Sequence, residues 1–180
     1  RLYIKRDDCT GLATGGSKTR KLEFLVGEAV RQGADTLLTQ GAVQSNHVRQ
    51  TGAAAAFMGL ACEAILEERV QGAPAAYHES GNVLLDHLFG IPLHRVPAGT
   101  AMDAALEALA QKLRAQGRKP YVIPGGGSNA LGSLGYVDCV LELQRQCDAM
   151  GLRKPHLVHA TGSAGTQAGL VAGVHALGLD

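Results

Sequence analysis

The sequence is poor in aromatic residues and carries almost no net charge. None of its 180 residues is tryptophan, aromatic residues make up 4%, and 17 basic residues against 16 acidic ones leave a formal charge of +1. Proteins that bind nucleic acids through the phosphates carry a surplus of positive charge, often beside aromatic side chains that stack on bases. We therefore expect no nucleic-acid partner.

Long apolar runs and metal-binding patterns are also missing. Apolar runs such as Ala53–Met58 are far shorter than the roughly 20 residues of a membrane span, and no signal-sequence pattern precedes the strand-like residues 2–5. The four cysteines show no CxxC spacing, and none of the seven histidines pairs with a cysteine at zinc spacing. We expect a cytoplasmic protein without membrane contact and without a metal site.

Strand-like and helix-like segments alternate along the chain. Hydrophobic residues make up 46%, which is enough for a packed core. In the first helix-like segment, Leu22, Leu25 and Ala29 recur at helical spacing. The predicted strands are 2–5, 36–39, 62–66, 93–96, 121–123 and 156–160, and the predicted helices are 20–32, 46–58, 82–89, 102–116, 131–150 and 165–177. This alternation predicts an α/β fold, with parallel strands covered by helices on both faces.

Glycine gathers where predicted strands give way to helices. Three such junctions are the segments 40–46, 124–129 and 161–166, and a fourth segment, 14–21, places a lysine directly before a helix. Open parallel sheets bind ligands at this edge, because the first N–H groups of the helices point there without partners. We therefore expect the functional site at these junctions.

Three common motifs do not fit. The segment 125–130 matches GxGxxA, but the next strand has no acidic residue at its tip to hold a ribose. Lys18-Thr19 lacks the glycines of a Walker phosphate loop, and no serine has the flanking glycines of a hydrolase nucleophile. The small residues and hydroxyls of the segment 162–166 suit a phosphate cradle at a helix start, and an ordinary tight turn is the alternative.

Lys18 and the segment 45–47 each allow two interpretations. Lys18 is either a solvated cation or an amine whose pKa is lowered by the positive end of a helix, which would suit a Schiff-base nucleophile. Ser45 is either the N-cap of a buried helix or part of a carboxylate site, with Asn46 or His47 projecting toward a ligand. Spacing alone leaves these alternatives open.

Several motifs in fixed order resemble pyridoxal-phosphate enzymes of the tryptophan-synthase-like fold type (fold type II). They are the segments 4–8 (IKRDD), 15–24 (GGSKTRKLEF), 44–50 (QSNHVRQ), 125–136 and 160–170. The nearest branch holds 1-aminocyclopropane-1-carboxylate deaminase, D-cysteine desulfhydrase and L-cysteate sulfo-lyase. The resemblance implies two open parallel sheets flanked by helices, pyridoxal 5'-phosphate as cofactor and a homodimer. It divides the chain into a larger cofactor domain (1–33 and 125–180) and a smaller inserted domain (34–124), with the family's C-terminal part missing.

The resemblance also implies a role for each candidate residue. Lys18 would bind the cofactor covalently, Asn46 would hydrogen-bond its phenolic oxygen, and Ser45 would face the substrate carboxylate or relay a proton. A cysteate enzyme would also need a cation or several donors around the leaving group, and His47 and Thr14 are the candidates for that contact. The residues implied for the phosphate are Gly162, Ser163, Ala164, Gly165 and Thr166. Ser17 departs from the family, which commonly has asparagine at this position, so a supporting hydrogen bond is expected to differ.

The expected reaction is a β-elimination from a small amino acid. The segments 8–14, 124–127 and 159–163 look most like the L-cysteate sulfo-lyase subgroup, so the first expectation is conversion of L-cysteate to pyruvate, sulfite and ammonia. D-cysteine desulfhydrase, which releases hydrogen sulfide, and then 1-aminocyclopropane-1-carboxylate deaminase are the enzymatic alternatives. A truncated cofactor-binding module without catalysis is the alternative from outside the enzymes.

Overall fold

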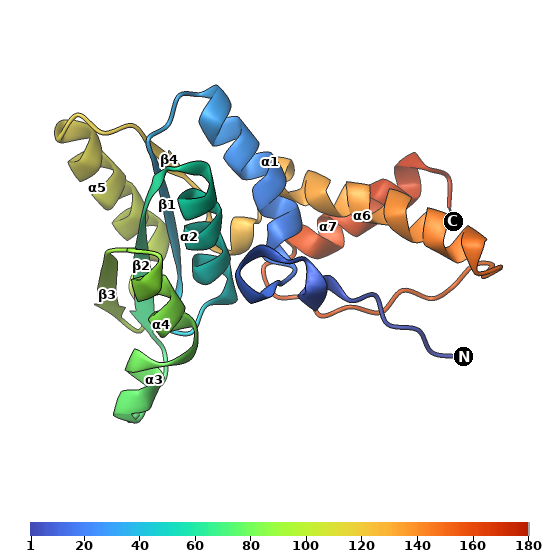
Figure 1. Ribbon diagram of the computed structural model, residues 1–180, viewed down its shortest axis with the longest axis horizontal. Helices are drawn as coiled ribbons and strands as arrows, with labels where there is room; N and C mark the ends of the chain where they lie inside the picture. Colours follow the sequence, from blue (N-terminus) through green and yellow to red (C-terminus); the bar gives the residue numbers. More distant parts are fainter. Residues whose placement is uncertain (180) are drawn as a thin grey trace.

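A four-stranded parallel sheet forms one half of the molecule (Figure 1). The computed structural model describes residues 1–179. The strands are β1 (Thr36–Ala42), β2 (Ala61–Glu68), β3 (Leu93–Pro97) and β4 (Pro120–Val122), in the order β3-β2-β1-β4. Every neighbouring pair is parallel, which confirms the predicted fold class. The connections leave β1 toward β2 on one side and return to β4 on the other, so the carboxyl ends of β1 and β4 border a crevice of the kind that binds ligands.

Seven α-helices accompany the sheet in the described part of the chain. They are α1 (Lys18–Arg31), α2 (Asn46–Met58), α3 (Ala75–Glu79), α4 (Gly81–Leu88), α5 (Met102–Ala115), α6 (Ala130–Ala149) and α7 (Gly165–Ala176). Six of them were predicted to within two residues at either end. The short helix α3 was not predicted. Short 3-10 turns cover Asp7–Cys9, Leu12–Thr14 and Gly125–Gly127.

The two faces of the sheet bury different helices. Side chains alternate along a strand, so Leu37 and Leu38 of β1 point to opposite faces. Leu37 belongs to the core that includes Leu25 of α1 and Val48 of α2. Leu38 packs against α5 around Leu106. The sheet is therefore covered on both sides, as expected for a parallel sheet.

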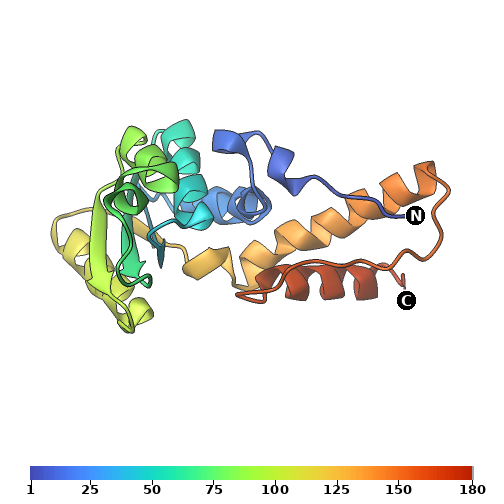
Figure 2. The ribbon, with the colours of Figure 1, turned by 90° about the horizontal axis from the view of Figure 1, so that it is seen from below.

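Helices α6 and α7 form the other half of the molecule and lie side by side, with the segment 151–164 running back along them (Figure 2). Glycines permit the close approach. A Cβ on Gly169 of α7 would lie 2.2 Å from the carbonyl oxygen of Ser133 in α6, and one on Gly135 of α6 would lie 2.0 Å from the carbonyl oxygen of Arg20 in α1. The first turn of α1 is thereby fixed against α6.

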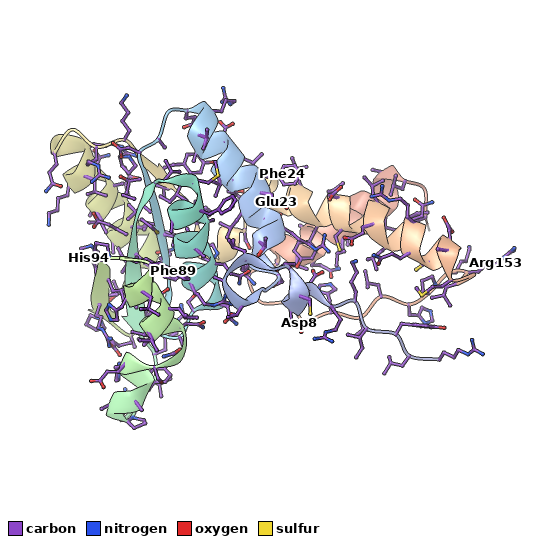
Figure 3. All side chains as sticks on the ribbon, viewed as in Figure 1. Asp8, Glu23, Phe24, Phe89, His94 and Arg153 are labelled. Atoms are coloured by element: carbon purple, nitrogen blue, oxygen red, sulfur yellow. The ribbon has the colours of Figure 1, made fainter. Side chains whose placement is uncertain are left out.

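Two predicted strands are not strands. Residues 1–6 and 155–161 are extended, but they pair with no strand among the described residues, so the second predicted sheet is not formed there. A strand needs a hydrogen-bonded neighbour, and local sequence alone does not supply one. Both segments instead line one cavity beside α6 and α7. The view with side chains gives the same division of the molecule, with His94 in the sheet half and Arg153 at the far end of the other half (Figure 3).

The four strands and α2 to α5 all fall within residues 36–122, inside the range 34–124 expected for a smaller domain. The helices α1, α6 and α7 come from the two ranges expected for the larger one. The division of the chain into two domains stays a prediction.

Candidate active site

Lys18 is the first residue of α1 and lines a cavity of about 880 Å³. Its ammonium donates a hydrogen bond to the hydroxyl of Ser17 at 3.2 Å. The side chain is partly buried, and this burial lowers the pKa of the Lys18 amine below its usual value. The placement at a helix start matches the sequence prediction and favours an amine that loses its proton easily.

A second lysine, not singled out from the sequence, lies one turn further along α1. Lys21 is buried, and its ammonium donates to the hydroxyl of Ser128 at 2.9 Å and to the carbonyl oxygen of Gly126 at 3.2 Å. Burial, with a smaller effect from the Lys18 charge, lowers the pKa of Lys21 to about 8. The spacing of three residues from Lys18, which puts both on one helix face, was the available sequence signal.

The predicted phosphate loop faces these two lysines. Gly162, Ser163, Ala164 and Thr166 line the same cavity as Lys18 and Lys21. Ala164 has a positive φ of 61° and precedes the first turn of α7, whose N–H groups have no acceptor within the helix. The hydroxyl of Ser163 lies 2.6 Å from that of Ser128.

Gly165 lets the start of α7 lie close to the donor groups of Ser128 and Lys21. A Cβ there would lie 2.6 Å from the Ser128 hydroxyl and 2.8 Å from the Lys21 ammonium. Hydroxyls, an ammonium and a helix N-terminus thus converge on one position, which is the donor set that binds phosphate. The loop is thus both a tight turn and a match to the donor set of a phosphate site, and its phosphate role stays a prediction.

The start of α2 combines a helix cap with a buried histidine. The Ser45 hydroxyl accepts a hydrogen bond from the Val48 N–H at 3.3 Å, so Ser45 is the N-cap. The Oδ1 atom of Asn46 accepts from the side-chain amide of Asn82 at 2.9 Å. His47 points inward, with its Nε2 2.8 Å from the Thr39 hydroxyl. Complete burial, and then the charges of the two lysines, lower the pKa of His47 to about 3, so its ring is uncharged.

Two further residues of α2 tie this helix to the loop before Lys18. The side-chain oxygen of Gln50 accepts from the Thr19 N–H at 3.1 Å, and its amide group donates to the Asn46 carbonyl oxygen at 2.9 Å. Arg49 donates to the carbonyl oxygens of Ala13 and Gly15. Arg49 and Gln50 belong to the motif 44–50, but the sequence alone predicted no role for them.

The structure thus divides the predicted site residues into two groups. Lys18 and the loop 162–166 meet in the cavity, whereas Ser45, Asn46 and His47 lie at the start of α2 and do not line it. Thr14 is exposed, has a positive φ of 67° and lies outside the cavity as well. The described residues contain no cluster of three or more side chains that could hold a metal ion.

Comparison with known proteins agrees with this geometry. The family described as "Pyridoxal-phosphate dependent enzyme" matches the chain over residues 1–180. The chain therefore belongs to the pyridoxal-phosphate-dependent enzymes.

Named relatives narrow the resemblance. D-cysteine desulfhydrases of Salmonella paratyphi B and Salmonella newport are 53% identical over 180 residues, a match that covers 99% of this chain and 54% of theirs. A solved structure described as an ACC deaminase homologue is 42% identical, with a TM-score of 0.84 over 99% of this chain and 52% of that one. A hydrogen sulfide-producing enzyme from Fusobacterium nucleatum, at 15% identity and a TM-score of 0.72 over 98% of this chain and 51% of its own, shares the fold. The chain spans about half the length of these relatives.

The residues present fit the cofactor of this family. Lys18 offers a primary amine of lowered pKa, and Lys21, Ser163 and the N-terminus of α7 offer an ammonium, a hydroxyl and N–H groups for a phosphate at the same cavity. None of the helices in residues 1–179 is long and apolar enough to span a membrane.

Proposed function

We propose that this protein is a pyridoxal-phosphate-dependent lyase that cleaves D-cysteine to pyruvate, hydrogen sulfide and ammonia with uptake of one water. The observation that carries the proposal is the meeting of Lys18, Lys21 and the loop 162–166 in one cavity. The relatives named D-cysteine desulfhydrase, at 53% identity, support the choice of substrate.

Each side chain has a task in this proposal. The cofactor phosphate would be bound by four groups: Lys21, Ser128, Ser163 and the N-terminus of α7. Lys18 would hold the cofactor through its side-chain amine and, as a free amine, would remove the proton from the substrate α-carbon. The lowered pKa of Lys18 favours this second task, because an uncharged amine is needed. The bound cofactor supplies an electron-withdrawing ring that stabilises the carbanion left behind.

The substrate carboxylate binds at the start of α2 in this proposal. The first N–H groups of that helix and the Ser45 hydroxyl would be its donors, and Asn46 would hydrogen-bond the phenolic oxygen of the cofactor, as the family resemblance implies. Support comes from the sheet topology, since the segment 43–46 follows β1 at the crevice beside β4. Gln50 and Arg49 hold this segment against the loop that leads to Lys18.

The two candidate substrates, cysteine and cysteate, differ in the charge of their leaving groups. A sulfonate carries a full negative charge, so a cysteate enzyme needs a cation or several donors around it. His47 was the histidine expected to contribute there, but its ring is buried, uncharged and hydrogen-bonded to Thr39. A cysteine thiol has no such requirement. We therefore place D-cysteine ahead of L-cysteate, which was the first expectation from the sequence.

The first experiment tests the lysine. The protein expressed from its complete gene is incubated with pyridoxal phosphate, reduced with borohydride and digested for peptide mapping. We expect the adduct on Lys18, and we expect Lys18→Ala to lose both the adduct and turnover, whereas Lys112→Ala, on the exposed face of α5, keeps both. Wild-type turnover by Lys18→Ala would refute the assignment.

The second experiment tests the substrate. Sulfide release from D-cysteine, sulfite release from L-cysteate and ammonia release from 1-aminocyclopropane-1-carboxylate are measured side by side. We expect D-cysteine to have the highest kcat/KM. A higher value for aminocyclopropane carboxylate would favour the activity suggested by the ACC deaminase homologue, and a trapped adduct without turnover of any substrate would favour a non-catalytic cofactor-binding module.

A further inference from the structure

Helix α4 contains a buried carboxylate without a partner. Asp86 has no exposed surface, and neither of its carboxylate oxygens finds a hydrogen-bond partner among residues 1–179. Its helix neighbour Val83 and the nearby Ile91 belong to the hydrophobic core. A buried charge is costly unless it is paired, so a carboxyl in this position either keeps its proton or attracts a counter-ion. Packing alone gives no reason for an acidic residue here.

The cation that faces Asp86 is Arg49 of α2, which is also buried. Burial raises the pKa of the Asp86 carboxyl to about 7, and the attraction of Arg49 offsets this only in part. Among the described residues the other titratable group that faces Asp86 is Cys62 of β2. Burial, reinforced by Asp86, raises the pKa of that thiol to about 12, so Cys62 stays uncharged.

The hydrogen bonds of Arg49 nevertheless go to other groups. Its guanidinium donates to the carbonyl oxygens of Ala13 and Gly15, the latter at 3.0 Å, and to the side-chain oxygen of Asn82 at 2.8 Å. Residues 13 and 15 belong to the turn that leads directly to Lys18. One buried guanidinium therefore joins this turn to α2 and α4, and its α4 partner Asn82 lies one helical turn before the unpartnered Asp86.

We propose that Asp86 is a positioning residue that acts on the turn at residues 13–16 through Arg49. While the Asp86 carboxyl keeps its proton, the guanidinium is free to hold the carbonyl oxygens of Ala13 and Gly15. Once the carboxyl is ionised, it competes for the same guanidinium and loosens the turn in front of Lys18. The effect on catalysis rests on the proposed function, whereas the effect on the turn does not.

The test compares wild type with Asp86→Asn, which keeps the shape of the side chain and removes its charge. Hydrogen–deuterium exchange is measured for a peptide spanning residues 10–19 at pH 6 and pH 8 and corrected for intrinsic rates. We expect exchange in the wild type to rise about tenfold between these pH values, the size of coupling that neighbouring charged groups show. Asp86→Asn should stay protected at both, and Asp138→Asn, on the exposed face of α6, should behave like wild type.

A second variant and a kinetic measurement complete the test. Arg49→Lys keeps the charge but loses the fork of donors, so the turn should exchange rapidly at both pH values. The KM for D-cysteine should rise in wild type relative to Asp86→Asn between pH 6 and pH 8, by about the same factor. If Arg49→Lys does not fold, Asp86→Asn decides alone.

The outcomes separate the two proposals. An equal rise in exchange for wild type and Asp86→Asn overturns the positioning role, whatever the activity. The expected exchange pattern in a protein that cleaves none of the substrates supports the positioning role and refutes the proposed function.

Discussion

The contact between α1 and α6 is tight enough for one methyl group to test whether it positions the site. In Gly135→Ala the new Cβ would lie 2.0 Å from the carbonyl oxygen of Arg20, where contacts under 3.0 Å are essentially never seen. The two helices must therefore separate by about 1 Å. Overpacking of this kind costs about 1–3 kcal/mol, of which the better helix propensity of alanine returns about 0.5–1 kcal/mol. We expect a net loss of up to about 2.5 kcal/mol.

The matched control is Gly27→Ala in α1, where a Cβ would meet nothing within 4 Å. This change should stabilise the protein by about 0.5–1 kcal/mol, because it brings only the helix propensity of alanine. Urea unfolding of both variants measures the difference. Because Arg20 lies between Lys18 and Lys21, Gly135→Ala should also weaken pyridoxal-phosphate binding, measured by fluorescence titration. Equal stabilisation by both changes would refute the contact, and unchanged cofactor affinity in a destabilised Gly135→Ala would refute its role in the site.

Three further predictions follow from titratable groups in and around the site. Lys21→Met removes a charge-assisted hydrogen bond of about 1.5–3 kcal/mol, so cofactor affinity should fall about tenfold to a hundredfold in a fluorescence titration. Unchanged affinity would mean that the phosphate binds elsewhere. Folding raises the pKa of Asp86 from 3.8 to about 7, so the protein should lose up to about 4 kcal/mol of stability as the pH rises from about 4 to 7. Urea unfolding across this range should show the loss in wild type but not in Asp86→Asn. His47 is uncharged above its pKa of about 3, so His47→Gln should leave the shape of the pH–rate profile between pH 5 and pH 8 unchanged, and loss of a limb near pH 6.5 would contradict its burial.

Much of the fold could be predicted from local sequence patterns. Apolar residues at helical spacing, as in α1, must face a core, and parallel strands fed by such helices have few arrangements available. Helix α2 was predicted with the bounds that the structure gives it, because Ser45 is a strong cap and Gly59 ends the helix with a positive φ. Residue type and position made the loop 162–166 and Lys18 candidates, and the family resemblance gave them their predicted roles.

Strand formation at residues 2–5 and 156–160 could not be read in the same way. Their composition favours an extended backbone, and the backbone is extended, but a strand is defined by the neighbour to which it hydrogen-bonds. The neighbour of a parallel strand is distant in sequence, so no local pattern contains it.

The charge states of the site residues also depend on burial, which the sequence does not show. The sequence placed Lys18 at a helix start and His47 beside Asn46. It could not show whether the ring of His47 points toward a ligand or into the core. Folding turned that ring inward to Thr39, buried Lys21 against Ser128, and left Asp86 without a hydrogen-bond partner among residues 1–179. The pKa of a side chain is set by the solvent and charges around it, and these come from elements far apart in the chain. Residue types therefore specify which groups are available, and packing specifies which of them carry charge.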